Sequence, residues 1–288
     1  MSSNRVNTVG VVGGNGYVGA QIAQHLIKYA QDGKVKLVLF HRKGNPVKVA
    51  QDIKSENVES REFDLDGPSA LASQALGAEI HLVDALIKSS AIKVYIPSSY
   101  SLTWNAKDFA DPKLGPVISG FYTGLNHAKK VGLPVCHIYS GTFDSWVFGM
   151  GFLFPPIKEN AMVANKGMLE NGLAITTPDH IGTAVARLAL TEDLSSLANT
   201  THHVVSFRPT GNELVKLFTE LHGSPTKVSD YTPEMREEKM GSGPFGPVGV
   251  GYIDKWADAK DEYGRDGMVD HDKEYEGPGL QAVAKSYL

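Results

Sequence analysis

The chain has 288 residues, of which 42% are hydrophobic and 21% charged, a composition typical of a globular protein that buries a core without disulfides or a structural metal. Its net charge of −4, with no block of like charges, argues against a nucleic-acid partner, because such proteins usually carry a basic stripe. The single cysteine, Cys136, lies in a strand-like run and fits a buried thiol in a reducing compartment. No apolar run reaches the ~18 residues of a membrane span and the N-terminus lacks a secretory apolar segment, so we expect a cytoplasmic protein without a membrane partner.

The first forty residues predict a strand, a glycine-rich turn, a helix and a second strand. Residues 9–12 form a short apolar run typical of a buried parallel strand, and residues 20–30 carry apolar side chains at helical spacing. Residues 35–40 predict the second strand. Between the first strand and the helix, residues 13–19 have the sequence GGNGYVG, which satisfies both common glycine patterns of dinucleotide-binding turns.

This turn has the features that a dinucleotide requires. Glycines permit a tight turn and let backbone N–H groups approach a pyrophosphate, while the start of the helix adds partial positive charge. A glycine-rich turn without a ligand is the alternative. The residues expected to contact the cofactor here are Gly13, Asn15, Gly16, Tyr17 and Val18.

The end of the second strand indicates which dinucleotide is bound. NAD sites usually place an Asp or Glu there to bind the ribose 2′-hydroxyl, whereas this chain has His41, Arg42 and Lys43. Two cations suit a 2′-phosphate, which an arginine grips in a fork while stacking on adenine. We therefore expect Arg42 and Lys43 to select NADP(H); a solvated basic turn is the alternative.

The remaining elements follow from the same periodicities. Strands are expected at residues 62–65, 93–97, 135–139 and 204–207, with a helix start at 66–69, one helix or two in succession over 70–90, and helices at 121–130, 178–190 and 211–222. No residues remain within 70–90 for the strand that a doubly wound fold normally places between two such helices. Residues 241–251 are so rich in Gly and Pro that we expect no regular structure there, only a lid or a plain surface loop.

Several motifs together resemble one known family. The glycine turn followed by Arg42 resembles the NmrA-like and isoflavone-reductase-like branch of the atypical short-chain dehydrogenases. Residues 93–100 (KVYIPSSY) resemble its RFIPSEF strand end, and residues 139–146 (YSGTFDSW) resemble its NGLF.DW segment. Further matches are the acidic turn at 64–66, the fourth helix at 81–88 and the DIG-type helix start at 177–182.

The resemblance implies an α/β fold with a Rossmann-type doubly wound parallel sheet and a smaller C-terminal substrate-binding part. The NADP-binding domain would cover residues 1–150 and the substrate-binding part residues 151–288, with residues 175–210 returning to the Rossmann core. Pro97 and Ser98, at the end of a core strand, are expected beside the cofactor. The activity implied is that of an NADP(H)-dependent oxidoreductase acting on a small organic metabolite in secondary metabolism.

Three departures separate the chain from the family pattern. The usual fourth strand is missing between Leu76 and Glu79, so either the sheet is rebuilt or the sequence is shortened there. Phe121 stands where the reductases carry a lysine, and no Tyr-x-x-x-Lys pair exists, since the fourth residue after Tyr122 is not lysine. The acid of the PSEF segment is replaced by Ser99.

Hydride transfer needs a proton donor, and without the family lysine another group must serve. Tyr100 is the first choice because the C-terminal ends of strands face the cofactor cleft in open α/β sheets. Ser98 and Ser99 beside it, Tyr122 in the next helix, and Asp144 are the other candidates by position. A purely structural role is the alternative for each of them.

Two other functions stay open. The missing lysine favours an isomerase or cyclase that retains NADP(H) without net redox chemistry, and the family also contains non-catalytic NADP-sensing regulators. No metal site is predicted, because the neighbours His202 and His203 point to opposite faces of a strand. The substrate and the oligomeric state are left open. Five aromatic residues are candidates for an apolar pocket, with core packing as the alternative: Trp104, Trp146, Phe148, Phe152 and Phe154.

Overall fold

A computed structural model of the chain describes residues 6–63, 76–260 and 265–288. The strands are β1 (Asn7–Val12), β2 (Val35–His41), β3 (Val58–Glu62), β4 (Cys136–Ser140), β5 (Thr142–Phe143), β6 (Ala161–Val163), β7 (Ile175–Thr176), β8 (Thr200–Val204), β9 (Lys227–Ser229) and β10 (Val269–Asp270). The α-helices are α1 (Tyr17–Gln31), α2 (Leu76–Leu86), α3 (Ala106–Ala110), α4 (Leu114–Phe121), α5 (Thr123–Lys130), α6 (Lys166–Glu170), α7 (Pro178–Leu188), α8 (Gly211–His222), α9 (Pro233–Met240), α10 (Gly246–Ala257) and α11 (Leu280–Lys285). The acidic turn predicted at 64–66 and the helix start predicted at 66–69 lie outside the described residues.

The N-terminal βαβ unit has the predicted form. β1, β2 and β3 make a parallel sheet in that order, with Val9 opposite Leu37 in the register of β1 and β2. The buried face of α1 consists of Ile22, Ala23, Leu26, Ile27 and Ala30. These side chains pack with Leu37 and Leu39 of β2 and with α7 in one core cluster. Full burial of a Leu or Ile side chain contributes about 1.5–3 kcal/mol, so this face holds the unit together.

The central sheet is divided in two. β10, β8 and β4 form a second parallel sheet, which a bridge between Tyr95 and Val135 extends toward the first sheet. In the described part of the chain, no strand pairs with the second edge of β1. Thr8, Gly10 and Val12, which share one face of β1, are exposed.

The helix α2 accounts for this division. Its described part runs from Leu76 to Leu86, so the residues where the sequence lacks a fourth strand are helical, as expected. The strand predicted at residues 93–97 is wrong in extent, since only Tyr95 makes a strand-like bridge. The physical reason is that a strand needs partners, and the described residues place only β4 beside this segment.

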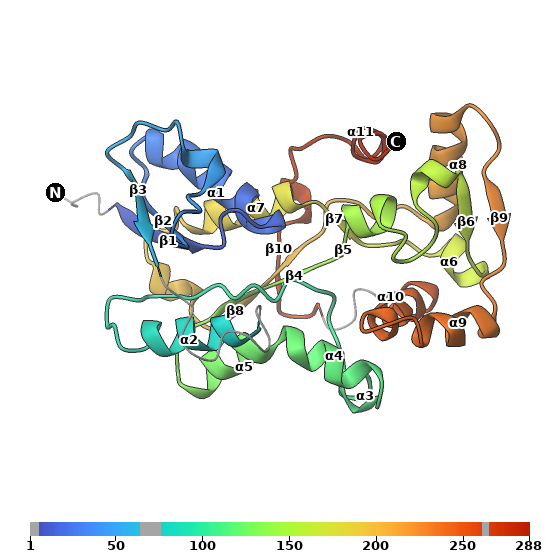
Figure 1. Ribbon diagram of the computed structural model, residues 1–288, viewed down its shortest axis with the longest axis horizontal. Coiled ribbons are helices and arrows are strands. Elements are labelled where there is room, and N and C mark those ends of the chain that lie inside the picture. Colours follow the sequence, from blue (N-terminus) through green and yellow to red (C-terminus); the bar gives the residue numbers. More distant parts are fainter. Residues whose placement is uncertain (1–5, 64–75, 261–264) are drawn as a thin grey trace.

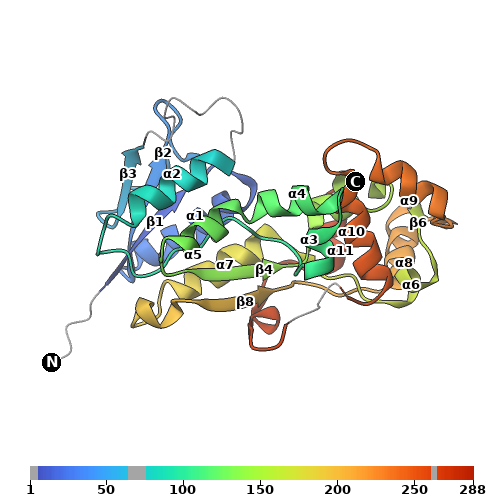
Figure 2. The ribbon, with the colours of Figure 1, turned by 90° about the horizontal axis from the view of Figure 1, so that it is seen from below.

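Figure 1 shows the two ends of the molecule. β1, β2 and β3 lie at one end, while β6, β9, α6, α8 and α9 gather at the other, and β4 and β8 run between them. α1 and α7 cover one face of the β4–β8 sheet, and α2 and α5 cover the opposite face, as the turned view in Figure 2 also shows. Trp146 packs against the core clusters of both ends and therefore lies where the two parts of the chain meet.

The later elements agree with the sequence in part. The helices predicted at 178–190 and 211–222 are confirmed as α7 and α8, and β4 matches the strand predicted at 135–139. The predicted helix 121–130 is confirmed as α5, which begins at Thr123, and α4 precedes it and ends at Phe121. The strands predicted at 62–65 and 204–207 lie earlier, as β3 and β8.

The irregular segment predicted at 241–251 is wrong, because α10 begins within it. Pro247 stands in the first turn of α10, where a missing N–H costs nothing. The glycines let this helix approach its neighbours closely: a Cβ on Gly251 would lie 3.0 Å from the Trp104 ring, and one on Gly249 would lie 2.9 Å from Cε of Lys239. Tertiary packing thus outweighs the low helix propensity of glycine. Of the helices in the described part of the chain, none combines the length and apolarity needed to cross a membrane.

Candidate dinucleotide and substrate site

The glycine turn between β1 and α1 is closed by its own backbone. Gly13 has φ +80°, a conformation that favours glycine, and its carbonyl accepts a hydrogen bond of 2.8 Å from the Gly16 N–H. A Cβ on Gly19 would overlap that same carbonyl, so only glycine lets α1 start this close to β1. α1 has no acidic residue in its first turn, and no described side chain caps it. Its first N–H groups therefore suit an external anion.

A cavity of about 230 Å³ lies beside this turn. Its lining residues come from the turn, the end of β2, the following loop and the end of β3: Val12, Gly13, Gly14, Asn15, Phe40, His41, Arg42, Asn45, Val47 and Phe63. The rings of Phe40 and Phe63 meet edge to face, with centroids 5.5 Å apart. The cavity thus has apolar walls suited to a flat ring, with Arg42 at the end of β2. Lys43 is exposed and is not among the lining residues.

Asn15 ties the glycine turn to the loop that follows β2. Its Nδ2 donates to the Pro46 carbonyl at 3.0 Å, and its Oδ1 accepts from the Lys48 N–H at 2.8 Å. The two walls of the cavity are therefore held as one unit. The side chain that the sequence predicted to contact the cofactor is engaged within the protein, and direct contact by Asn15 stays a prediction.

Tyr17 connects the same turn to a buried carboxyl group. The Tyr17 side chain is 49% exposed, and its hydroxyl donates to Oδ1 of Asp144 at 2.7 Å. The hydroxyl of Tyr287, next to the C-terminus, donates to Oδ2 of Asp144 at 3.0 Å. Asp144 is 6% exposed, and burial raises its pKa although the two tyrosine hydroxyls oppose the rise. Tyr287 carried no signal in the sequence, since it lies 143 residues from its partner.

The other predicted residues of the strand end surround Glu79. The Oε1 of Glu79 accepts hydrogen bonds from the Tyr95 hydroxyl and from the Ser98 N–H, the latter at 3.2 Å. Ser98 is exposed and Pro97 is buried. Tyr100 packs against the Rossmann core, where burial, and then the charge of Glu79, raise the pKa of its hydroxyl. Sequence reasoning missed Glu79 because its partners follow it by 16 and 19 residues with no motif to mark them.

Two of the candidate proton donors are enclosed by protein. Tyr122 is 5% exposed; its hydroxyl lies 2.9 Å from Oγ of Ser101 and donates to the Leu102 carbonyl at 3.2 Å. These contacts satisfy the hydrogen bonding of the Tyr122 hydroxyl within the protein. Ser99 is 2% exposed, and its Oγ has no hydrogen-bond partner among the described residues.

A row of aromatic rings leads away from the glycine turn. The centroids are 5.6 Å apart for Tyr17 and Phe143, 5.5 Å for Phe143 and Trp146, and 4.8 Å for Trp146 and Phe152. Phe143 is buried, whereas Trp146 and Phe152 keep part of their surface exposed. We call these four residues the aromatic row. Of the other aromatic candidates, Phe148 and Phe154 are core residues and Trp104 is partly exposed.

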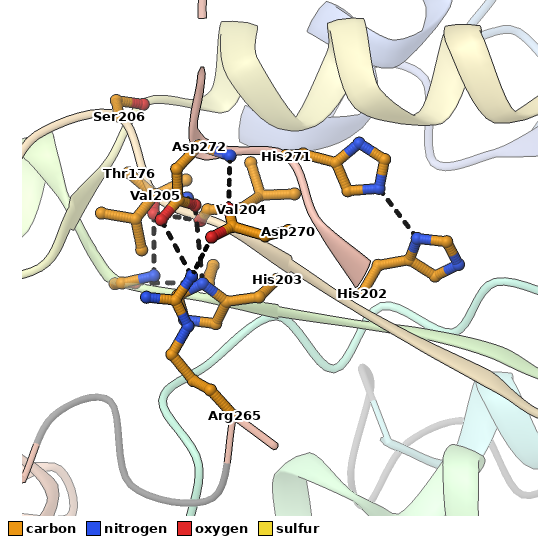
Figure 3. A network of polar contacts seen from close by, with 12 residues as sticks. Thr176, His202, His203, Val204, Val205, Ser206, Arg265, Asp270, His271 and Asp272 are labelled. Atoms are coloured by element: carbon orange, nitrogen blue, oxygen red, sulfur yellow. Dashed lines mark hydrogen bonds and ion pairs between the residues drawn. The ribbon is translucent and has the colours of Figure 1, made fainter. Parts of the chain in front are cut away.

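The C-terminal segment also makes a polar network with β8. In Figure 3, His202 points toward His271 and His203 points toward Asp272, so the two neighbours face opposite sides of β8 as predicted. His202 Nδ1 lies 2.8 Å from His271 Nε2, and burial together with His271 lowers the pKa of His202 to about 4. Asp272 accepts from the Val205 N–H at 2.7 Å. Within residues 6–63, 76–260 and 265–288, no group of three His, Cys, Asp or Glu side chains is arranged to hold a metal ion.

Comparison with solved structures identifies the fold of this chain. An isoflavone reductase matches with a TM-score of 0.71 and 14% sequence identity, over 98% of this chain and 99% of that one. A leucoanthocyanidin reductase from Vitis vinifera in a ternary complex matches with a TM-score of 0.71 and 15% identity, over 98% of this chain and 99% of that one. A Citrobacter sp. triphenylmethane reductase complexed with NADP(H) matches with a TM-score of 0.65 and 17% identity, over 98% of this chain and 100% of that one. The chain has the fold of the isoflavone reductase-like enzymes. No family model matches the sequence, and neither does any curated protein.

This finding confirms the Rossmann-type α/β fold expected from the motifs. At 14–17% identity the likeness establishes the architecture, and the site must be argued from this chain's own residues. The glycine turn, Arg42 and the cavity between them lie together, as the sequence predicted. Tyr100 lies on the segment that follows the Tyr95 bridge, and Asp144 directly follows β5, which comes after β4 in the chain.

Proposed function

We propose that this protein is an NADP(H)-dependent oxidoreductase that acts on a small organic metabolite in secondary metabolism. The observation that carries the proposal is the cavity beside the glycine turn, which has Arg42 in its lining and no acidic residue. A Glu or Asp there would favour NAD(H), and a guanidinium favours the 2′-phosphate of NADP(H). The proposal is supported by the fold, since reductases of the same fold have been crystallised with NADP(H) or NADPH.

The residues present fit this cofactor. The uncapped start of α1 suits the pyrophosphate, and the apolar walls that include Phe40 and Phe63 suit the adenine. Arg42, with Lys43 nearby, would bind the 2′-phosphate, and Pro97 and Ser98 would lie beside the nicotinamide half. When bound, NADPH supplies the hydride.

For the proton we favour Asp144 together with Tyr17. Burial raises the pKa of Asp144, which keeps a larger fraction of its carboxyl protonated. A 2.7 Å hydrogen bond from Tyr17 connects Asp144 to the glycine turn, called the cofactor turn below. Tyr100 is the second candidate, since it follows the strand end. Asp144→Asn and Tyr100→Phe distinguish them: loss of the donor should lower kcat at least tenfold while leaving the Kd for NADPH within about twofold.

We also propose the division into an NADP-binding domain (1–150) and a substrate-binding part (151–288). The return of residues 175–210 to the Rossmann core is supported by their packing, because Ile181, Ala184 and Val204 belong to the same core cluster as α1 and β2. The core cluster that contains Phe154, Phe218 and Trp256 of the substrate-binding part also includes Leu102, Leu114 and Ile118 from before residue 150.

The test of the function has two steps. Isothermal titration should give a Kd for NADPH well below that for NADH, and Arg42→Ala should raise the NADPH value roughly ten- to hundredfold with little change for NADH. A panel of carbonyl and conjugated olefin compounds should then be screened for loss of NADPH absorbance. Comparable affinities for NADPH and NADH would overturn the cofactor assignment. Product formation without loss of NADPH would assign the isomerase activity instead, and tight NADPH binding with no turnover would indicate the regulator.

A further inference from the structure

Two lysines of the C-terminal part enter apolar surroundings, and their electrostatic environments differ. Lys255 on α10 is 6% exposed, and its Nζ lies 2.9 Å from a carboxylate oxygen of Asp108. Lys239, near the end of α9, is half-buried, and no carboxylate of the described residues lies within ion-pair distance of it. A half-buried ammonium has lost part of its hydration and has no carboxylate to replace it, so an anion beside it would be favourable.

The surroundings of Lys239 hold its amine beside the aromatic row. Its Nζ lies 6.0 Å from the centre of the Phe152 ring, and its stem runs along α10 where Gly249 leaves space. Phe152 is the last ring of the row that begins at Tyr17 on the cofactor turn. The cation therefore sits at the end of a row of ring contacts that starts on the glycine turn and in which Trp146 and Phe152 are partly exposed. Burial lowers the pKa of Lys239, as expected for a cation that lacks compensation.

We propose that Lys239 is an anion-recognition residue of the substrate-binding part, which pairs with an anionic oxygen of a small organic acid whose apolar body lies on Trp146 and Phe152. This proposal rests on the proposed function, because it names the chemical class of molecule that the same protein would take. A phosphate is usually held by several donors, whereas one cation can pair with a single carboxylate, sulfonate or phenolate.

The test uses two fluorescent probes that share one aromatic frame. 8-Anilinonaphthalene-1-sulfonate carries an anion, and N-phenyl-1-naphthylamine lacks it. Both are titrated into the full chain in the presence of saturating NADP⁺, which keeps them out of the dinucleotide cavity. Lys239→Met should raise the Kd of the sulfonate probe about tenfold or more and leave the neutral probe within twofold. Lys239→Arg, which keeps the charge, should stay within about threefold for both probes.

Matched variants separate recognition from general effects. Lys216 on α8 is a lysine whose side chain is 79% exposed, and Lys216→Met should change neither Kd. Phe152→Leu removes the ring and keeps an apolar side chain, so it should weaken both probes. Lys239→Met should melt no lower than the unsubstituted chain, because it removes an uncompensated cation from a half-buried position.

Each result supports or overturns the proposal. An unchanged Kd for the sulfonate probe in Lys239→Met, or equal weakening of both probes, overturns the role of Lys239. NADPH titration of the same variant keeps this outcome separate from the proposed function. If NADPH binds as in the unsubstituted chain, only the anion recognition has failed. If the unsubstituted chain binds no NADPH, the proposed function fails, whatever Lys239 does.

Discussion

Removing the Tyr287 hydroxyl tests whether the C-terminus supports the carboxyl group beside the cofactor turn. In Tyr287→Phe, the 3.0 Å hydrogen bond to Asp144 is lost and the bond from Tyr17 remains. A hydrogen bond to an ionised group contributes about 1.5–3 kcal/mol, and one to a neutral group about 0.5–1.5 kcal/mol. Water reaches the partly exposed Tyr287, so we expect a loss of about 1–1.5 kcal/mol in the free energy of unfolding at pH 7.

The pH dependence of this loss gives a second measurement. Burial raises the folded-state pKa of Asp144, so its contribution to stability is present below the unfolded pKa and is lost as pH rises through the folded value. Without the Tyr287 hydroxyl the folded pKa rises further, because one group that stabilises the carboxylate is gone. The stability deficit of Tyr287→Phe should therefore be larger at pH 7 than at pH 4.

The assay is urea unfolding of Tyr287→Phe, Asp144→Asn and the double variant, followed by circular dichroism at both pH values. Residues that share a hydrogen bond are expected to show an interaction energy above about 0.5 kcal/mol in the double-mutant cycle. Strictly additive effects at pH 7, or a deficit that grows as the pH falls, would refute the reasoning. Either result would mean that Tyr287 only packs against Gly149, where a Cβ would meet its ring at 2.9 Å.

Two further changes probe the loops and the C-terminal network. Asn15→Ala removes the bonds to Pro46 and Lys48, so urea unfolding should show a loss of about 1 kcal/mol and titration a three- to tenfold weaker NADPH complex; unchanged binding would show that the two loops hold without the tie. His202 has a lowered folded pKa, so its contribution to stability is lost as pH falls from 6.5 toward 4, and His202→Gln should flatten the stability profile over that window. The same slope in both proteins would contradict that assignment.

The parts that sequence reasoning predicted are those encoded by neighbouring residues. The glycine turn and α1 follow from a local pattern, and α8 is marked by a capping box in which Thr210 and Glu213 cap each other's backbone N–H groups. α7 is similarly marked by the Thr177 cap and by Pro178 in its first turn. Such signals act within a few residues, so the helices that they mark can be predicted without knowing the tertiary contacts.

The parts that were missed depend on contacts between distant segments. Glu79 acquires its role only because α2 brings it to Tyr95 and Ser98. α10 is helical in spite of its glycines because they allow close packing on Trp104 and Lys239. Nothing within a short window of sequence encodes either arrangement. The Rossmann fold was therefore predictable, whereas the contacts of Glu79 and the packing of α10 were not.

The described strands do not connect β1 to β4, so the N-terminal sheet is joined to the second sheet largely through the packing of α1 on α7. Gly182 marks the closest approach: a Cβ there would lie 2.8 Å from the backbone of Gln21 and 2.9 Å from the His25 ring. His25 Nε2 also lies 2.7 Å from Asp179 on α7. The position of the cofactor turn relative to the second sheet thus depends on this contact.

Gly182→Ala tests that dependence. The added methyl group overpacks the contact, because backbone atoms of Gln21 cannot move aside as a flexible side chain would. Overpacking costs about 1–3 kcal/mol, and the higher helix propensity of alanine offsets up to ~1 kcal/mol of this. We therefore expect the free energy of unfolding to fall by about 1–2 kcal/mol. NADPH binding should weaken at the same time, since α1 carries the turn. Gly241→Ala is the matched control: its φ is −90° and its nearest Cβ neighbour lies at 3.6 Å, so stability and binding should stay nearly unchanged. If both variants bind NADPH like the unsubstituted chain, α1 and α7 do not set the position of the cofactor turn.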